Sequence, residues 1–92
     1  MSVASTIQRK LEDALSPVAV DVHDDSHLHA GHAGARAGGE SHFRVHVVAA
    51  AFLGLSRVAR QRRIYEILAD EMSGPVHALQ IRAETPEEAA RG

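Results

Sequence analysis

Histidine is the residue type whose number and spacing most clearly suggest chemistry in this sequence. Seven of the 92 residues are His, and three of them form an H-x-H-x-x-H pattern at His27, His29 and His32. Imidazole nitrogens are good ligands for zinc, copper, iron and nickel. In an extended segment His27 and His29 project to the same side, and nearby glycines allow a third imidazole to approach the same ion. The spacing alone leaves two readings open: a metal site, or a solvated loop that binds metal only adventitiously.

A separate histidine, His77, follows Gly74-Pro75 at the expected start of a strand, on the same face as Leu79 and Ile81. A lone His in such a place is usually a core or edge residue with a satisfied hydrogen bond. The end of a strand is also a rigid position from which to present a ligand. The sequence therefore leaves a structural and a ligand role open for His77.

Basic residues gather at the expected start of the second long helix. They are Arg57, Arg60, Arg62 and Arg63. Each cation near a helix N-terminus opposes the macrodipole, at a cost of about 0.3–1 kcal/mol. Local helix stability does not explain this placement, which suggests contact with an acidic partner or with phosphates. The alternative is a solvated face on which Arg62 pairs with Glu66, four residues further along.

The composition limits what these groups can belong to. Apolar residues make up 45% and charged residues 24% of the chain, which excludes a wholly disordered protein. The longest apolar run, 47–53, is too short to cross a membrane. A net charge of −2 and 3% aromatic residues argue against general phosphate binding and base stacking. The absence of Cys excludes disulfides and thiolate ligands from this chain.

The elements that must position these residues follow from hydrophobic periodicity and from helix start and stop signals. We expect one domain over residues 1–92 and, because the N-terminus lacks a signal-peptide pattern, a cytoplasmic location. The first half of the chain should form a helix from Val3 to Leu15 ended by Pro17, a strand over 18–22 and a flexible His/Gly-rich loop over 23–40. A second strand should then run from Ser41 as far as Ala50, followed by a helix that is capped by Ser56 and stopped by Gly74-Pro75. The chain should end with a strand over 76–83 and a short helix that opens with the capping box Thr85-Pro86-Glu87-Glu88.

This α-β-β-α-β-α order predicts an α+β fold with a three-stranded mixed sheet and helices packed on one face. In the second strand Phe43, Val45 and Val47 should share one face. In the second long helix the expected apolar stripe consists of Val58, Gln61, Tyr65, Leu68 and Met72. On that stripe the amide of Gln61 would be partly buried and would need a hydrogen-bond partner.

Several blocks of this sequence, taken together, resemble the BolA family in order and spacing. The blocks are DDSH at 24–27, GESHFRV at 39–45, FLG at 52–54, VHAL at 76–79 and TP at 85–86. The resemblance spans nearly the whole chain. It implies the family's α-β-β-α-β-α fold, which is similar to a class II KH domain, in agreement with the elements above.

The resemblance also implies a function. Members of the family form heterodimers with monothiol glutaredoxins of the CGFS type and share a [2Fe–2S] cluster with them, with glutathione as a further ligand. They act in iron–sulfur trafficking or iron sensing and are not enzymes. The family's C-terminal ligand His falls on His77. The second ligand comes from the long loop as His or Cys, so in this Cys-free chain His29 is the first choice and His32 the second. Two imidazoles with two partner thiolates resemble a Rieske centre in ligand type.

Two other functions stay open from the sequence. Some bacterial family members are described as DNA-binding transcriptional regulators of cell shape and stress response, a role that would use the four arginines near residue 60. The family commonly has Arg-His-Arg where this chain has Arg60-Gln61-Arg62, so a role of that His cannot be carried over. The lesser alternative is a metal binder that uses the His-rich loop alone, for which His77 would not matter.

Overall fold

A computed structural model of the protein describes residues 2–25 and 42–91. The described elements follow the predicted order, with a short 3-10 helix added before the second long helix and a break near that helix's end. The elements are α1 (Val3–Leu15), β1 (Ala19–Asp24), β2 (His42–Val48), η2 (Ala50–Phe52), α2 (Arg57–Ile67), α3 (Ala69–Ser73), β3 (Ala78–Glu84) and α4 (Pro86–Ala90).

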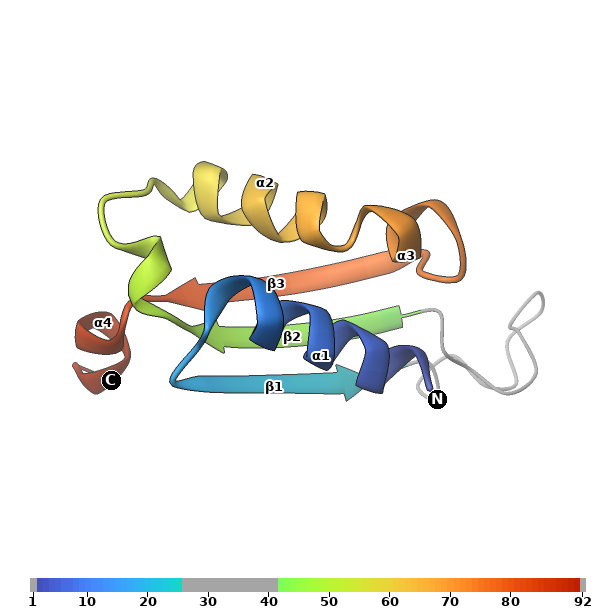
Figure 1. Ribbon diagram of the computed structural model, residues 1–92, viewed down its shortest axis with the longest axis horizontal. Coiled ribbons are helices and arrows are strands. Elements are labelled where there is room, and N and C mark those ends of the chain that lie inside the picture. Colours follow the sequence, from blue (N-terminus) through green and yellow to red (C-terminus); the bar gives the residue numbers. More distant parts are fainter. Residues whose placement is uncertain (1, 26–41, 92) are drawn as a thin grey trace.

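The three strands form one mixed sheet, as predicted, and their order in it is β1-β2-β3. Strand β2 pairs antiparallel with β1 and parallel with β3, so that Val45 lies between Val22 and Ile81. Strand β1 extends to Asp24 and therefore includes two residues that the sequence had assigned to the loop. Because β2 and β3 run in the same direction, both strands begin at the same end of the sheet (Figure 1).

One face of the sheet packs against the helices and forms the hydrophobic core. In Figure 1, α1 crosses β1 and β2, and α2 runs beside β3. The predicted inward set of β2, Phe43, Val45 and Val47, is buried. These side chains join one cluster with Ile7 and Leu11 of α1, Ile64 of α2 and Leu68, which caps the C-terminal end of α2. The single core fixes the helices on one side and leaves the other face of the sheet open.

The buried face of α2 differs from the predicted one. Of the predicted stripe Leu68 is buried, but Val58 is 60% exposed and Tyr65 39% exposed. The helix buries Arg60 and Ile64 in their place. Gln61 is also exposed, so the expected need for a buried amide partner does not arise. The apolar pattern was misleading because a buried position is occupied by Arg60, whose charge is compensated within the fold. Val58, Gln61 and Tyr65 instead form a solvent-facing flank of α2.

Local signals at the element ends behave as the sequence indicated. The Ser56 hydroxyl accepts a hydrogen bond from the Ala59 N–H and caps α2. Thr85 and Glu88 form the predicted reciprocal capping box at the start of α4. Gly54, in the turn before α2, has φ +81°, a conformation that favours glycine. In the part of the chain that the structure describes, every helix is too short or too polar to cross a membrane.

Candidate functional site

His77 lies in the bend directly before β3 and its side chain is exposed. The strand begins at Ala78, two residues later than predicted, so His77 does not belong to the inward face of β3. The backbone before it is held by Val76, which is buried and whose N–H donates to the Glu71 carbonyl at 3.0 Å. The backbone after it is held by the pairing of Ala78 with His42. The fold therefore presents an exposed imidazole from a fixed stretch of chain.

The ends of the His-rich segment lie at the same end of the sheet as His77. The Asp25 N–H donates to the His42 carbonyl at 2.8 Å, so the chain leaves β1 and enters β2 side by side. His42 is in turn the register partner of Ala78, the neighbour of His77. The predicted ligands His29 and His32 belong to residues 26–41 and lie outside the described residues. The end of their segment at His42 is adjacent to the bend that holds His77, and the end at Asp25 lies on the other side of β2.

The described residues do not enclose a metal ion by themselves. Within 2–25 and 42–91 no group of three or more His, Asp or Glu side chains is placed to hold one. The chain also has no Cys. The exposed imidazole of His77 can contribute one nitrogen ligand.

The open face of the sheet carries a polar network that the sequence reasoning did not identify as a unit. His46 Nε2 lies 2.6 Å from Glu84 Oε1, and Arg82 Nε lies 3.2 Å from the same oxygen. The hydrogen bond from His46 and the charge of Arg82 lower the pKa of the Glu84 carboxyl. The alternation of β2 had placed His46 on this face, but nothing in the sequence paired it with Glu84. His46 is thereby engaged within the fold and is a poor candidate for a free ligand.

Arg60 departs from the surface role expected of the arginine cluster. Its side chain is buried, and Nη1 lies 2.6 Å from Glu88 Oε1. Nε donates to the Leu55 carbonyl at 3.0 Å, and Nη1 also donates to the Ala83 carbonyl at 3.1 Å. These partners use most of the donors of the guanidinium. Arg60 therefore holds elements together and is not available to DNA or a protein partner.

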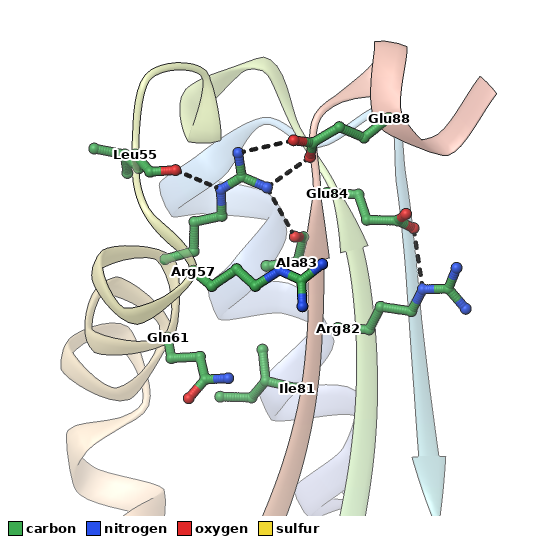
Figure 2. A pocket seen from close by; sticks show the side chains of 9 residues that line it. Leu55, Arg57, Gln61, Ile81, Arg82, Ala83, Glu84 and Glu88 are labelled. Atoms are coloured by element: carbon green, nitrogen blue, oxygen red, sulfur yellow. Dashed lines mark hydrogen bonds and ion pairs between the residues drawn. The ribbon is translucent and has the colours of Figure 1, made fainter. Parts of the chain in front are cut away.

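The other three arginines of the cluster are exposed. Among the described residues Arg57, Arg62 and Arg63 form no ion pair, and the pair of Arg62 with Glu66 that the spacing allowed is not formed. Figure 2 shows Arg57 extending from the start of α2 over a groove beside β3. The groove has a volume of about 590 Å³, and its walls include Leu55, Gln61 and Ile81. These three cations remain candidates for contact with an acidic partner.

Comparison with known proteins places this geometry in a family. A family model described as BolA-like protein matches residues 11–88. The chain is 46% identical over 84 residues to BolA-like protein 1 of Mus musculus, with 91% of this chain covered but only 58% of that relative's length. It is 35% identical to a protein of Haemophilus influenzae named DNA-binding transcriptional regulator BolA, with 96% of this chain and 82% of the relative covered.

The fold agrees with these sequence relationships. The structure of BolA1 from Arabidopsis thaliana superposes with a TM-score of 0.86 at 40% identity, and 96% of each chain is covered. The relatives are named as BolA-like proteins or as a regulator, and no enzyme family is indicated. The matched span includes β1, β2, α2 and β3 and the bend that holds His77. The chain therefore belongs to the BolA family.

Proposed function

We propose that this protein is an adaptor that binds a monothiol glutaredoxin and supplies His77 as a ligand to a shared [2Fe–2S] cluster. The observation that carries the proposal is the exposed imidazole of His77 beside the anchored ends of the His-rich segment. Membership of the BolA family supports it, because the resemblance of the VHAL block at 76–79 implies a cluster ligand at His77. The protein would act in iron–sulfur trafficking or iron sensing and not as an enzyme.

The chemistry of the donors suits a site divided between two proteins. Without Cys, this chain can offer imidazole nitrogens but no thiolate, so the thiolates would come from glutaredoxin and glutathione. His29, or His32 as the second choice, remains the proposed second imidazole. An imidazole binds metal through a neutral nitrogen, so binding would displace any proton held there. When bound, the cluster would be either the cargo of the pair or its iron-dependent signal.

Reconstitution with a monothiol glutaredoxin, glutathione, iron and sulfide under anaerobic conditions tests the proposal. Visible circular dichroism would be recorded for the wild type, for His77→Ala and for His23→Ala. His23 is the matched control because its imidazole is also exposed but belongs to β1. We expect the wild type and His23→Ala to change the glutaredoxin cluster spectrum in the same way and His77→Ala to lose that change. Equal spectra for all three proteins would contradict the role of His77.

The same variants separate the adaptor from a binder that uses the His-rich segment alone. Such a binder would take up iron or zinc without glutaredoxin, and His77→Ala would leave this uptake unchanged. Loss of uptake on substitution of His29 and His32, with no effect of glutaredoxin, would favour the simple metal binder.

A second candidate function is DNA binding. The Haemophilus influenzae relative is named a DNA-binding transcriptional regulator. In this chain Arg57, Arg62 and Arg63 are exposed at the start of α2 and form no ion pair within the described residues. Such cations suit contacts with phosphates, which give salt-dependent binding. The buried Arg60 would support this surface without contacting DNA.

A further inference from the structure

A groove runs between α2 and the outer edge of β3. Strand β3 is an edge strand, because the sheet order is β1-β2-β3 and β3 pairs only with β2 among the described strands. The groove lies along the C-terminal half of β3, where Ile81 and Ala83 line it opposite Arg57 and Gln61 of α2 (Figure 2). It is therefore bounded by a helix on one side and by a strand edge on the other.

The backbone of β3 offers hydrogen-bonding groups to this groove. The Ala83 carbonyl accepts a bond from Arg60 of α2, whereas the Glu84 carbonyl accepts one from the Ala49 N–H on the β2 side. In a strand, the polar groups of successive residues alternate between the two edges. The N–H and C=O of Ile81, two residues before Ala83, consequently lie on the groove side. They form a donor and an acceptor at the spacing that another extended chain requires.

The charge in the groove is uneven. Arg60 and Glu88 neutralise one another at 2.6 Å, and Glu84 is paired with Arg82 at 3.2 Å. Arg57 is left as the uncompensated cation over the groove, with no ion-pair partner within the described ranges. Leu55, which is 37% exposed, and Ile81 supply apolar surface to the same groove. A ligand that carries one carboxylate next to apolar side chains would match this surface.

We propose that the groove binds an extended acidic peptide segment of a partner protein, which pairs with the outer edge of β3 and places a carboxylate on Arg57. Addition of a peptide strand between a helix and a sheet edge is a known mode of recognition. Nucleic acid fits less well, because Arg57 is one uncompensated cation where a strand of phosphates needs several, and the described lining includes no aromatic residue on which a base could stack.

The groove is separate from the proposed cluster site. Ile81 follows His77 by four residues, which is roughly 13 Å of strand. The peptide would bind beside the end of β3, while His77 lies before its start. The groove proposal therefore rests on other residues than the cluster proposal and does not depend on it.

Binding of short synthetic peptides to the full chain tests this inference. Fluorescence anisotropy would be measured with a panel of labelled peptides in which apolar residues alternate with polar ones and one position is Asp. The same panel would be prepared with Lys in place of Asp, and again with the Asp but with N-methylated backbone nitrogens. A labelled single-stranded oligonucleotide would serve as the competing class of ligand. Backbone amide NMR shifts would locate the bound peptide.

We expect Asp peptides to bind, with the amides of Ile81 and Ala83 shifting, and both the Lys and the N-methylated peptides to bind about tenfold or more weakly. Arg57→Glu should weaken the binding of the Asp peptides by a similar factor. Arg63→Glu makes the same charge change at another exposed residue of α2 and should leave their binding unchanged. No binding by any Asp peptide would overturn the proposal. Equal losses with Arg57→Glu and Arg63→Glu, or unchanged binding after N-methylation, would also overturn it. Oligonucleotide binding that shifts Ile81 while the peptides do not would assign the groove to nucleic acid instead.

Discussion

Arg60 and Glu88 join α2 to α4 through a guanidinium–carboxylate pair, with Nη1 and Nη2 at 2.6 and 3.2 Å from the two carboxylate oxygens. Arg60 is buried and also holds the carbonyls of Leu55 and Ala83. Glu88 in turn accepts the Thr85 N–H at 2.8 Å, which closes the capping box of α4. One pair thus connects the turn before α2, the end of β3 and α4, and it builds one wall of the groove beside β3.

Replacement of Arg60 should destabilise the protein. Arg60→Ala would leave two carbonyls and a carboxylate without their donor, and we expect the free energy of unfolding to fall by about 2 kcal/mol. Urea denaturation at neutral pH measures this change. Arg63→Ala is the matched control, because Arg63 is exposed and should change stability by less than about 0.5 kcal/mol. Equal midpoints for the two variants would show that the pair contributes nothing to folding.

The pair also predicts how stability depends on acid. The hydrogen bond from Arg60, together with the backbone N–H of Thr85, lowers the pKa of Glu88 from 4.5 to about 2. A carboxyl with a lowered folded pKa stabilises the fold above its unfolded pKa, and this contribution is lost as the pH falls from about 4.5 toward 2. The urea midpoint should therefore drop more steeply over this range in the wild type than in Glu88→Gln. Parallel profiles for the two proteins would contradict the assignment.

The orientation of α2 is testable with two apolar truncations. Ile64 is fully buried in the core, whereas Val58 on the same helix is 60% exposed. Ile64→Ala should lower the free energy of unfolding by about 2–5 kcal/mol, because it removes buried surface and leaves a cavity. Val58→Ala should have an effect of less than about 0.5 kcal/mol. If thermal or urea unfolding shows that Val58→Ala lowers the free energy of unfolding as much as Ile64→Ala does, the face of α2 that carries Val58 packs against the sheet.

Most of the fold followed from local patterns in the sequence. The alternation of β2 identified its buried face, and Ser56 and the Thr85 box marked two helix starts because capping depends on neighbouring residues. The buried face of α2 could not be found in this way. Arg60 occupies a core-facing position only because Glu88, 28 residues away, supplies its counter-charge. A periodicity argument sees only the polarity of Arg60 and therefore selects the neighbouring apolar stripe.

The candidate site was predictable to a similar extent. Family blocks in the sequence pointed to His77, and the structure places it in an exposed bend beside the ends of the His-rich segment. The network of His46 with Glu84 depends on pairing across two strands, which sequence spacing does not reveal. The groove beside β3 likewise depends on how α2 sits against the edge of the sheet. Tertiary contacts, not residue types, decide these features.

The second candidate function predicts that DNA binding depends on the exposed cations of α2. Duplex DNA titrations at about 50 and 200 mM salt should show affinity falling steeply with salt, because phosphate contacts release counterions. Arg62→Ala with Arg63→Ala should weaken binding and reduce the salt slope. Lys10→Ala is a suitable control, because Lys10 is a cation that is already paired with Glu71 at 2.8 Å. Affinity that does not depend on salt, or that falls equally in the control, would argue against this surface.

The central claim is that the His77 imidazole binds the shared cluster, and electron–nuclear double resonance of the reduced complex with glutaredoxin tests it most directly. The wild type and His23→Ala should show the nitrogen coupling of a directly bound imidazole. His77→Cys, which offers a thiolate at the same position, should retain a cluster and the coupling of the second imidazole but lose the coupling of the His77 nitrogen. Nitrogen couplings that are the same in the wild type and in His77→Cys would contradict the account.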